Sequence, residues 1–236
     1  MHNVSMNIVG VVHSPFKQKF GIPRQPALAS SIAGKIEILP PYDRDEAFRD
    51  LDTFSHLWIS FVFHAIEKRD WQPMVRPPRL GGNKKVGVFA SRSTHRPNPL
   101  GLSVVTFEKL VRDNDKLYLH ISGHDLLDQT PVVDIKPYLP YSDNVSSASN
   151  GYASVTDIER YEVTFSKESA AKIKQWSDDN NTDLKTQLIE LLSQDPRPAY
   201  NKSNPEPQRG GMRFYDLNVS FSIENKCVNV VNIQEI

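Results

Sequence analysis

Two arginines, Arg92 and Arg96, lie in a short polar segment between two runs of strand-forming residues. The residues at 86–89 and 100–107 are rich in valine, leucine and phenylalanine, which is typical of strands on both sides of a shaped loop. The Pro-Asn-Pro sequence at 97–99 fixes the backbone and also restricts the residue before each proline. The segment therefore predicts a loop that holds two guanidinium groups in place. The alternative is a surface loop that proline merely stiffens.

Two carboxylates, Asp128 and Asp134, are flanked by apolar residues of a predicted strand region. A buried carboxylate needs a partner, because transferring an unpaired charge out of water is costly. Lys136, Arg92 and Arg96 are the candidate partners. The pattern fits a pair that faces a ligand, and the alternative is a structural ion pair.

Histidines and further acids near this region were weighed as metal ligands. His120, His124, Asp125 and Asp128 are suitable ligand types, but such residues at a strand end are more often hydrogen-bonded loop residues, so no metal site is predicted. His64 follows an aromatic strand and reads most simply as a core histidine. The chain has no G-x-G-x-x-G, Walker, H-E-x-x-H or G-x-S-x-G sequence, so a Rossmann-type cofactor domain is not expected.

Composition describes an ordinary globular protein. Of 236 residues, 39% are hydrophobic and 24% charged, and no apolar run approaches the roughly 20 residues of a membrane helix. With no recognisable signal sequence and a single cysteine, the chain is expected to be cytoplasmic, without membrane partners. The net charge is zero, yet residues 71–107 contain no acid. The basic residues of this stretch are Arg76, Arg79, Lys84, Lys85, Arg92 and Arg96.

Short strands with closely spaced turns dominate the first two thirds of the chain, which indicates a β-barrel or sandwich. A strand buried on both faces is predicted at 56–66, and a short amphipathic helix at 43–54. Residues 112–115 (RDND) predict a hairpin turn. The other predicted strands lie at 6–14, 34–39, 104–111, 116–122 and 126–139.

A different pattern follows a predicted linker at 142–154. A strand is predicted at 161–165, followed by two helices with Ser166 and Thr182 as their N-caps. A hairpin of strands at 213–223 and 226–233 closes the chain.

Several long strings of unusual composition then identify a resemblance. The chain resembles the TsaA-like family, and within it the TrmO group of S-adenosylmethionine-dependent tRNA (adenine-N6)-methyltransferases. The matching strings lie at 23–26 (PRQP), 54–64, 76–83 (RPPRLGGN), 87–102, 125–128 (DLLD), 130–138 (TPVVDIKPY) and 194–200 (QDPRPAY).

This resemblance implies a mainly β fold with an α+β C-terminal part. It implies a β-barrel domain at 5–145 that binds the cofactor and carries out catalysis, and a small α+β domain at 155–236 that binds tRNA. It also implies a homodimer with S-adenosylmethionine bound near the interface. The implied cofactor residues are Gln25, Pro26, Ala27, His64, Ala65, Arg92, Leu102, Asp125, Leu126, Leu127 and Asp128. Ala27 is a departure, since glycine is expected there in many relatives.

The implied reaction is N6-methylation of the threonylcarbamoyl-adenosine 3′ of the anticodon, with threonine tRNA as the expected substrate. The acyl group makes the nitrogen a poor nucleophile and its N–H more acidic, so placement and a proton acceptor are needed. Asp134, Lys136 and Tyr138 are the residues expected to line the reacting nucleotide.

Contact with the tRNA anticodon loop is expected from the basic stretch and the C-terminal domain, whose suitable residues are Arg197, Tyr200, Lys202, Arg209 and Arg213. One alternative is a non-catalytic barrel that binds nucleoside or RNA. Another is a small-molecule methyltransferase. Deleting the chain from about residue 153 is expected to abolish tRNA affinity but to leave cofactor affinity intact.

Overall fold

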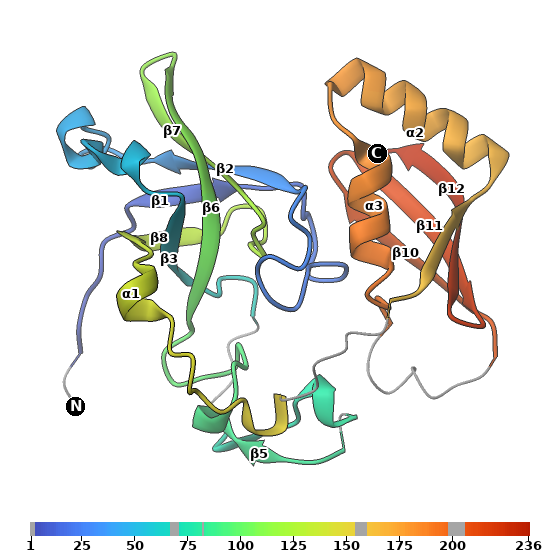
Figure 1. The fold of residues 1–236 in the computed structure, drawn as a ribbon, viewed down its shortest axis with the longest axis horizontal. Coiled ribbons are helices and arrows are strands. Elements are labelled where there is room, and N and C mark those ends of the chain that lie inside the picture. The colour runs from blue at the N-terminus through green and yellow to red at the C-terminus, as the bar shows by residue number, and fades with distance from the viewer. Residues whose placement is uncertain (1–2, 67–70, 82, 154–159, 198–205) are drawn as a thin grey trace.

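Two β-sheet units make up the protein (Figure 1). The computed structural model describes residues 3–66, 71–81, 83–153, 160–197 and 206–236. The first unit is a closed barrel, and the second, called the C-terminal unit below, comprises the described residues from 160 onward. The expected mainly β architecture with an α+β C-terminal part is observed.

The barrel follows the hydrogen-bonded order β1-β2-β7-β6-β3-β8, and β8 pairs back to β1. Every neighbouring pair is antiparallel. Its strands are β1 (Gly10–His13), β2 (Ala33–Ile38), β3 (His56–Val62), β6 (Leu100–Asp113), β7 (Lys116–Ser122) and β8 (Pro131–Pro137).

Every second side chain of the barrel strands points inward, and these side chains fill the barrel interior. In β3, Leu57, Ile59 and Phe61 are buried, whereas the residues between them lie on the outer face. The prediction that this strand is buried on both faces is therefore wrong, because Trp58, Ser60 and Val62 on its outer face remain partly exposed. The other buried core residues are Val12, Ile36, Ile38, Val105, Leu117, Leu119, Ile121, Leu126 and Val132.

The predicted helix at 43–54 is instead two short 3-10 turns, η1 (Asp45–Phe48) and η2 (Leu51–Thr53). Asp50 has a φ of 64° between them, and a left-handed residue interrupts helical hydrogen bonding. The predicted turn at 112–115 is confirmed: Asn114 and Asp115 have φ of 46° and 65°, as a type I′ turn requires. The strands predicted at 100–107 and 104–111 form the single long strand β6.

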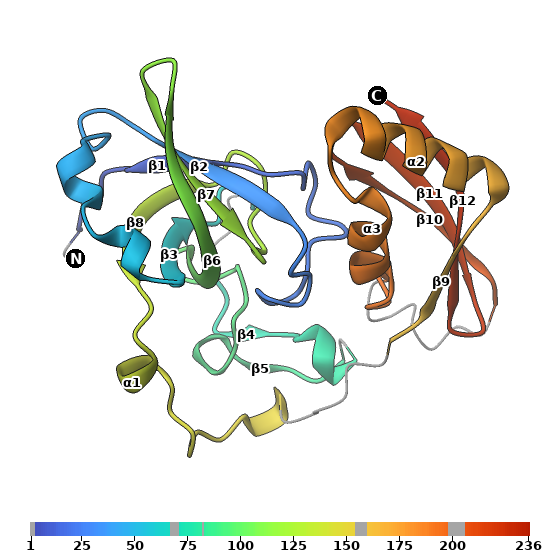
Figure 2. The same cartoon turned by 45° about the horizontal axis from the view of Figure 1, so that its top comes forward.

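Short elements lie between barrel strands β3 and β6 and after the last barrel strand, β8. A two-stranded sheet of β4 (Met74–Val75) and β5 (Val86–Gly87) lies beside the barrel, with η3 (Pro78–Leu80) between its strands and η4 (Val88–Ala90) after them (Figure 2). The chain leaves β8 through α1 (Pro140–Asp143) and η5 (Gly151–Ala153). In the described part of the chain, no helix is both long and apolar enough to cross a membrane.

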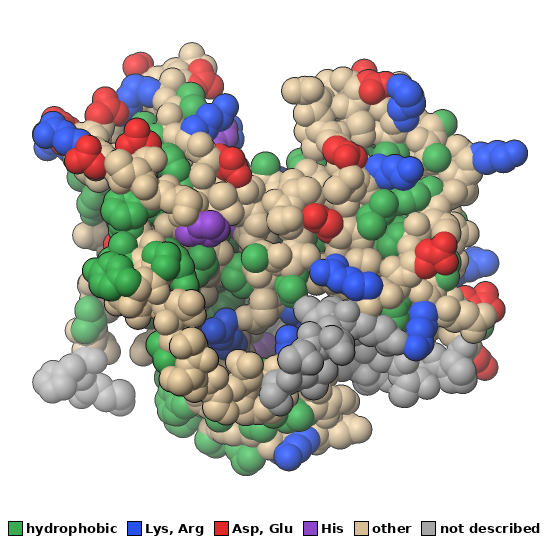
Figure 3. Space-filling view, viewed as in Figure 1, with side chains coloured by type: hydrophobic (Ala, Val, Ile, Leu, Met, Phe, Trp, Pro, Cys, Tyr) green, Lys and Arg blue, Asp and Glu red, His purple; other side chains and the backbone are tan. Residues whose placement is uncertain are grey.

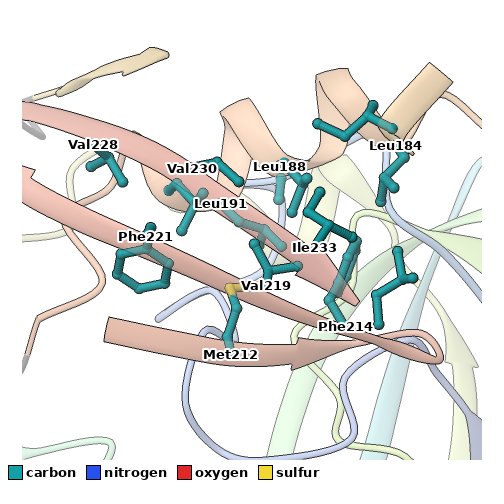
Figure 4. Packing of buried hydrophobic residues seen from close by; sticks show 14 of the residues in the cluster. Leu184, Leu188, Leu191, Met212, Phe214, Val219, Phe221, Val228, Val230 and Ile233 are labelled. Carbon is teal, nitrogen blue, oxygen red and sulfur yellow. The ribbon is translucent and has the colours of Figure 1, made fainter. Parts of the chain in front are cut away.

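The C-terminal unit packs two helices against a four-stranded sheet of order β10-β11-β12-β9. Figure 4 shows the leucines of the second helix, Leu184, Leu188 and Leu191, over the strands. The elements are β9 (Glu162–Phe165), α2 (Lys167–Asn180), α3 (Leu184–Leu192), β10 (Gln208–Phe214), β11 (Leu217–Glu224) and β12 (Cys227–Glu235).

The cap of α2 is confirmed, since Ser166 accepts a hydrogen bond from the Ser169 N–H. The cap of α3 is Asp183 rather than Thr182, because the Asp183 side chain accepts from the Thr186 N–H. The strand predicted at 213–223 is divided into β10 and β11, and Tyr215, with a φ of 55°, lies in the turn between them.

The connection between β1 and β2 (residues 14–32) extends from the barrel to the C-terminal unit (Figures 1 and 2). Phe16, Ala29 and Ile32 are buried in the same hydrophobic cluster as the leucines of α3. Phe16 also forms a β-bridge with Phe214, and the Tyr215 N–H donates to the Pro15 carbonyl at 2.9 Å. The two units are therefore joined by a shared hydrophobic core.

Close packing at Gly101 gives a stability prediction. A Cβ at this position would lie 2.2 Å from the ring of Phe61, which is buried in the barrel. We expect Gly101→Ala to lower the free energy of unfolding by about 1–3 kcal/mol, because overpacking forces buried side chains to move. Thermal and denaturant unfolding measure the change. Gly87→Ala is the matched control, since nothing lies within 4 Å of its added methyl. Equal stability of the two variants would contradict the packing argument.

Candidate functional site

The residues expected to bind a cofactor gather at one end of the barrel. This end is formed where β1, β3 and β7 finish and where β2, β6 and β8 begin. Gln25, Pro26 and Ala27 belong to the β1–β2 connection, and residues 125–128 to the connection between β7 and β8 (residues 123–130). Three chain segments remote in sequence thus meet here, because the segment carrying Arg92 reaches the same place.

The main chain at Ala27 is held in an unusual conformation. Its φ is 63°, and its N–H donates to the Gly123 carbonyl at 2.8 Å. An L-residue in this left-handed region costs roughly 1–2 kcal/mol, which explains why glycine suits the position. The Gly123 N–H in turn donates to the Ile32 carbonyl at 3.0 Å. The two connections are therefore bonded to each other through their main chains.

Both guanidinium groups of the proline-bounded loop are held in place, as predicted. Arg92 Nη1 donates to Gln25 Oε1 at 2.5 Å, so it extends from its own loop to the β1–β2 connection. Arg96 Nη1 donates to the carbonyls of Ser91 and Ser93 at 2.9 and 3.3 Å. Arg96 therefore fixes the loop, whereas the exposed Arg92 is placed where an anion could reach it.

Asp125 is mostly desolvated, and burial raises the pKa of its carboxyl. The hydroxyl of Ser103, itself buried on β6, donates to Asp125 Oδ1 at 2.6 Å and opposes that shift, as does the charge of Arg92. A desolvated carboxylate at the end of the barrel is a strong acceptor for hydroxyl or amino groups of a ligand. Sequence reasoning missed Ser103, because a serine in a strand carries no sign of its partner.

Asp128 has a structural task. Its Oδ1 accepts the Ser14 N–H at 2.9 Å, and its Oδ2 pairs with Lys17 at 2.8 Å. The Asp128 N–H donates to the Phe16 carbonyl at 2.9 Å. This residue thus latches the start of the β1–β2 connection to the β7–β8 connection. Its partner is Lys17, not the Lys136, Arg92 or Arg96 that the sequence offered.

The middle of the same turn is buried. Leu126 has no exposed surface and packs in the barrel core, so its part in a ligand site is limited to its main chain. Its N–H donates to His124 Nδ1 at 3.3 Å. Burial lowers the pKa of His124 to about 4, so the ring is neutral and structural at neutral pH. Leu127 lies beside it and is half-buried.

His64 and Ala65 follow β3 at this end of the barrel. His64 Nδ1 and Thr130 Oγ1 are 3.5 Å apart, and the histidine is exposed rather than in the core. Partial burial lowers the pKa of His64, and the nearby Asp128 opposes that effect. Leu102 lies on the outer face of β6 next to Ser103, and its side chain is 56% exposed.

The residues expected to be catalytic lie on the outer face of β8, or directly after it in the case of Tyr138, rather than in the cluster at the barrel end. Asp134 pairs with Lys136, and the Tyr138 ring lies tilted against that of Trp58 with centroids 5.7 Å apart. Asp134 lies opposite Ser60 of β3, and Ser60 lies opposite Leu102 of β6. Two strand spacings of roughly 4.8 Å thus separate Asp134 from Leu102. Asp134 has the Lys136 partner that the sequence suggested.

Basic side chains lie in a hollow beside the barrel. Figure 3 shows Lys and Arg side chains in this hollow, between the barrel and the β4–β5 segment. Arg197 differs from the other predicted RNA-contacting residues, because it is nearly buried and its Nε donates to Asp195 at 2.8 Å and its Nη2 to Tyr161 at 2.8 Å. Arg209 and Arg213 are exposed on β10. Tyr200 and Lys202 lie outside the described residues.

The donor set suits a ligand with several polar parts. The guanidinium of Arg92, which Gln25 holds in place, can bind a carboxylate. The desolvated carboxylate of Asp125 can accept from a diol, and the main chain around Ala27 can bind the edge of a base. Among the described residues, no group of three or more histidine, cysteine or acidic side chains is arranged to hold a metal ion.

Comparisons with known proteins agree along the whole chain. The family model described as the tRNA-methyltransferase O N-terminal domain matches residues 11–144, and the model of the TrmO C-terminal domain matches residues 158–236. The tRNA (adenine(37)-N6)-methyltransferase of Escherichia coli K12 is 42% identical over 234 residues, which cover 99% of both chains.

Two further comparisons concern Pseudomonas aeruginosa. A relative with the provisional name of S-adenosylmethionine-dependent methyltransferase is 44% identical over 220 residues, covering 91% of this chain and 90% of the relative. A crystal structure of TrmO from this organism superposes with a TM-score of 0.80 at 35% identity, covering 99% of both chains.

The raised pKa of Asp125 gives a pH-dependent prediction. Because its folded-state pKa lies above the unfolded value, the folded protein binds more protons, and stability falls as pH rises between the two values. Asp125→Asn keeps an acceptor for Ser103 and removes the buried charge. We expect the free energy of unfolding to increase at neutral pH by roughly 0.5–2 kcal/mol. Thermal unfolding from acidic to neutral pH measures it.

Asp143→Asn is the opposite-sign control. The Leu139 N–H and then the Trp58 indole N–H lower the pKa of Asp143, so its contribution is present at neutral pH and lost as pH falls. This variant should be less stable at neutral pH. Unchanged or lower stability of Asp125→Asn at neutral pH would refute the desolvation argument.

Proposed function

We propose that this chain, which belongs to the tRNA-methyltransferase O family, methylates N6 of adenosine 37 in tRNA with S-adenosylmethionine as the methyl donor. The family models and the full-length relatives support the reaction. The observation on the molecule that carries the proposal is the meeting of Arg92, Asp125 and the Ala27 main chain at one end of the barrel. A cytoplasmic location is part of the proposal, because the proposed substrate is a tRNA.

The residues at the barrel end fit the polar groups of this cofactor. Arg92 is the group that would bind its carboxylate, and Asp125 the acceptor for its ribose diol or amino group. The main chain at Gln25–Ala27 would take the edge of the adenine. Asp128 supports these groups through Ser14 and Lys17 rather than by direct contact. His64, Ala65, Leu102 and Leu127 complete the proposed surroundings of the cofactor.

S-adenosylmethionine, when bound, supplies an electrophilic methyl group on a sulfonium. The nucleophile is N6 of an adenosine that already carries a threonylcarbamoyl group. N6 forms a bond to the methyl carbon, the bond from that carbon to sulfur breaks, and the N6 proton leaves. Asp134 is the proposed acceptor of this proton, and Lys136 orients the carboxylate through their ion pair. Tyr138 lies in the same outward row and would contact the nucleotide.

The barrel domain, residues 5–145, is proposed to hold both cofactor and reacting nucleotide, and the α+β domain, residues 155–236, to contact the rest of the tRNA. Arg209 and Arg213 support the second role, because both project from the edge strand β10. The hollow with basic side chains in Figure 3, between the barrel and the β4–β5 segment, supports anion binding beside the barrel. Threonine tRNA is the proposed substrate.

A homodimer is proposed from the outer face of the barrel. Leu100 and Leu102 of β6 are 37% and 56% exposed, and they lie in register with Val62 and Ser60 of β3. An outward apolar stripe on a barrel suits a self-complementary interface around a two-fold axis. Such an interface would lie beside Asp134, so a second copy would border the proposed catalytic face.

The reaction itself is tested with labelled S-adenosylmethionine and tRNA, with or without prior threonylcarbamoylation. We expect label to enter only the premodified tRNA, because the acyl group acidifies the N6 proton. Asp134→Asn should lower the rate constant by about 10²–10⁴-fold, the range for loss of a general base, with cofactor affinity unchanged. Asp113→Asn on the exposed β6–β7 hairpin is the control.

The outcomes separate the alternatives. Cofactor binding without transfer to any tRNA would favour a non-catalytic nucleoside- or RNA-binding barrel. Transfer to a small acceptor but not to tRNA would favour a small-molecule methyltransferase. Wild-type turnover of Asp134→Asn would remove this residue from the mechanism and leave the reaction in place.

Assembly is tested by light scattering. The unaltered protein should have twice the mass of one chain, which is 26.8 kDa. Leu100→Glu should yield monomers, because a buried charge without a partner opposes association. Val231→Glu is the matched control, since Val231 is also on a strand and 43% exposed but belongs to the C-terminal unit. A monomeric unaltered protein would exclude the dimer.

A further inference from the structure

Helix α3 of the C-terminal unit forms hydrogen bonds with the β1–β2 connection shortly after residues 25–27. Glu190 Oε2 accepts the Ser31 N–H at 3.0 Å and the Ser31 hydroxyl at 2.7 Å. Glu190 Oε1 accepts the hydroxyl of Ser30 at 3.3 Å. One carboxylate thus binds two consecutive residues of a segment about 160 positions away in the sequence. Hydrogen bonds to a charged group are among the stronger ones in proteins.

Two glutamines of the same helix region add hydrogen bonds to the main chain. Gln194 Nε2 donates to the Leu28 carbonyl at 3.0 Å, and Gln187 Nε2 donates to the Ser31 carbonyl at 3.1 Å. Gln187 is only 4% exposed, and its Oε1 accepts the Tyr215 hydroxyl at 3.0 Å, which fixes the orientation of the amide. Hydrogen bonds from the helix region thus reach Leu28, Ser30 and Ser31.

Apolar contacts anchor the same segment. Ala29 and Ile32 are 1% and 0% exposed and belong to the cluster that contains Leu188 and Leu191 of α3. Ala29 and Ile32 therefore pack in the hydrophobic cluster, whereas Ser30 and Ser31 between them bind Glu190 of the helix. The segment is held more firmly by the C-terminal unit than a surface loop of the barrel would be.

The residue directly before the segment that α3 binds, Ala27, has a strained main chain. Ala27 is left-handed, with a φ of 63°, and its N–H bond to Gly123 spans the two connections of the barrel end. A non-glycine residue keeps such a conformation only where its surroundings enforce it. On one side Arg92 binds Gln25, and on the other α3 binds residues 28–31. Hydrogen bonds from Arg92 on one side and from α3 on the other therefore fix the position of residues 25–27.

We infer that α3 is a positioning element for the cofactor site, so that the C-terminal unit sets cofactor affinity as well as contacting tRNA. This inference rests on the proposed function, because it takes residues 25–27 as part of the cofactor site. Glu190 is the central positioning residue. Preorganised loops bind more tightly because less ordering is needed on binding. Removing the C-terminal unit should then weaken cofactor binding, contrary to the sequence-based expectation that only tRNA affinity would be lost.

The test compares Glu190→Ala with Glu168→Ala in the full chain. Glu168 is an exposed glutamate of α2 that pairs with Lys172, so its loss removes the same charge from the same unit without touching the β1–β2 connection. Calorimetry with S-adenosylmethionine alone gives the dissociation constant. We expect Glu190→Ala to weaken binding by about 5- to 10-fold, within the range of one ordinary lost hydrogen bond, because Glu190 acts through the position of residues 25–27, and Glu168→Ala to leave it unchanged.

A second readout does not depend on the cofactor. Amide hydrogen exchange at Ala27, measured on the cofactor-free protein, should be faster in Glu190→Ala and unchanged in Glu168→Ala, because the Ala27–Gly123 bond opens more often. Ser31→Ala removes the hydroxyl partner, and the double variant with Glu190→Ala should be less than additive in cofactor affinity. Glu190→Gln, which keeps one acceptor oxygen, should restore part of the affinity.

The failures are distinguishable. Wild-type cofactor affinity in Glu190→Ala would overturn the inference, whether or not exchange at Ala27 is faster, and would leave the proposed function standing. Failure of the unaltered protein to bind S-adenosylmethionine would overturn the proposed function and with it the role assigned to α3 in cofactor binding.

Discussion

Residues 14–32 are bonded to the barrel through their main chain while their apolar side chains are buried in the core of the C-terminal unit. Asp128, Gly123 and Ala27 make the hydrogen bonds on the barrel side. Phe16 and Ile32 supply buried surface on the other side. Because neither set of contacts can be broken without exposing polar or apolar groups, the two units are held together at the candidate cofactor site. The geometry of that site depends on both units.

Environment rather than residue type separates the roles of the acids in this region. Asp128 accepts a main-chain N–H and pairs with Lys17, so its charge is used within the structure. Asp125 is desolvated, and the hydrogen bonds and charge around it offset only part of the cost of burying its ionised form. A ligand that donates hydrogen bonds would therefore stabilise the ionised carboxylate of Asp125 most. Asp134 lies outside the barrel with Lys136, where its carboxylate remains accessible. Three similar carboxylates thus suit three roles. Asp128 suits a structural contact, Asp125 a ligand contact and Asp134 a proton acceptor.

Local signals predicted those elements that local chemistry decides. The turn at 112–115 formed as expected, because asparagine and aspartate tolerate left-handed conformations. Ser166 capped α2 as expected, because its side chain can reach the Ser169 N–H. The predicted helix at 43–54 failed, because its apolar spacing was compatible with two 3-10 turns on the barrel surface. The β10–β11 turn was missed, because Tyr215 and Asp216 lack a glycine or proline signal.

The sequence by itself determined the family, the strand-rich architecture and the residues that gather at the barrel end. Long strings of fixed residues carry that information without reference to contacts. Tertiary structure alone decided which partner each of these residues has. Ser103 meets Asp125, Lys17 meets Asp128, and Glu190 meets Ser31 across about 160 residues. Such pairings depend on strand register and on the docking of two cores, and neither leaves a periodic or compositional trace in the chain.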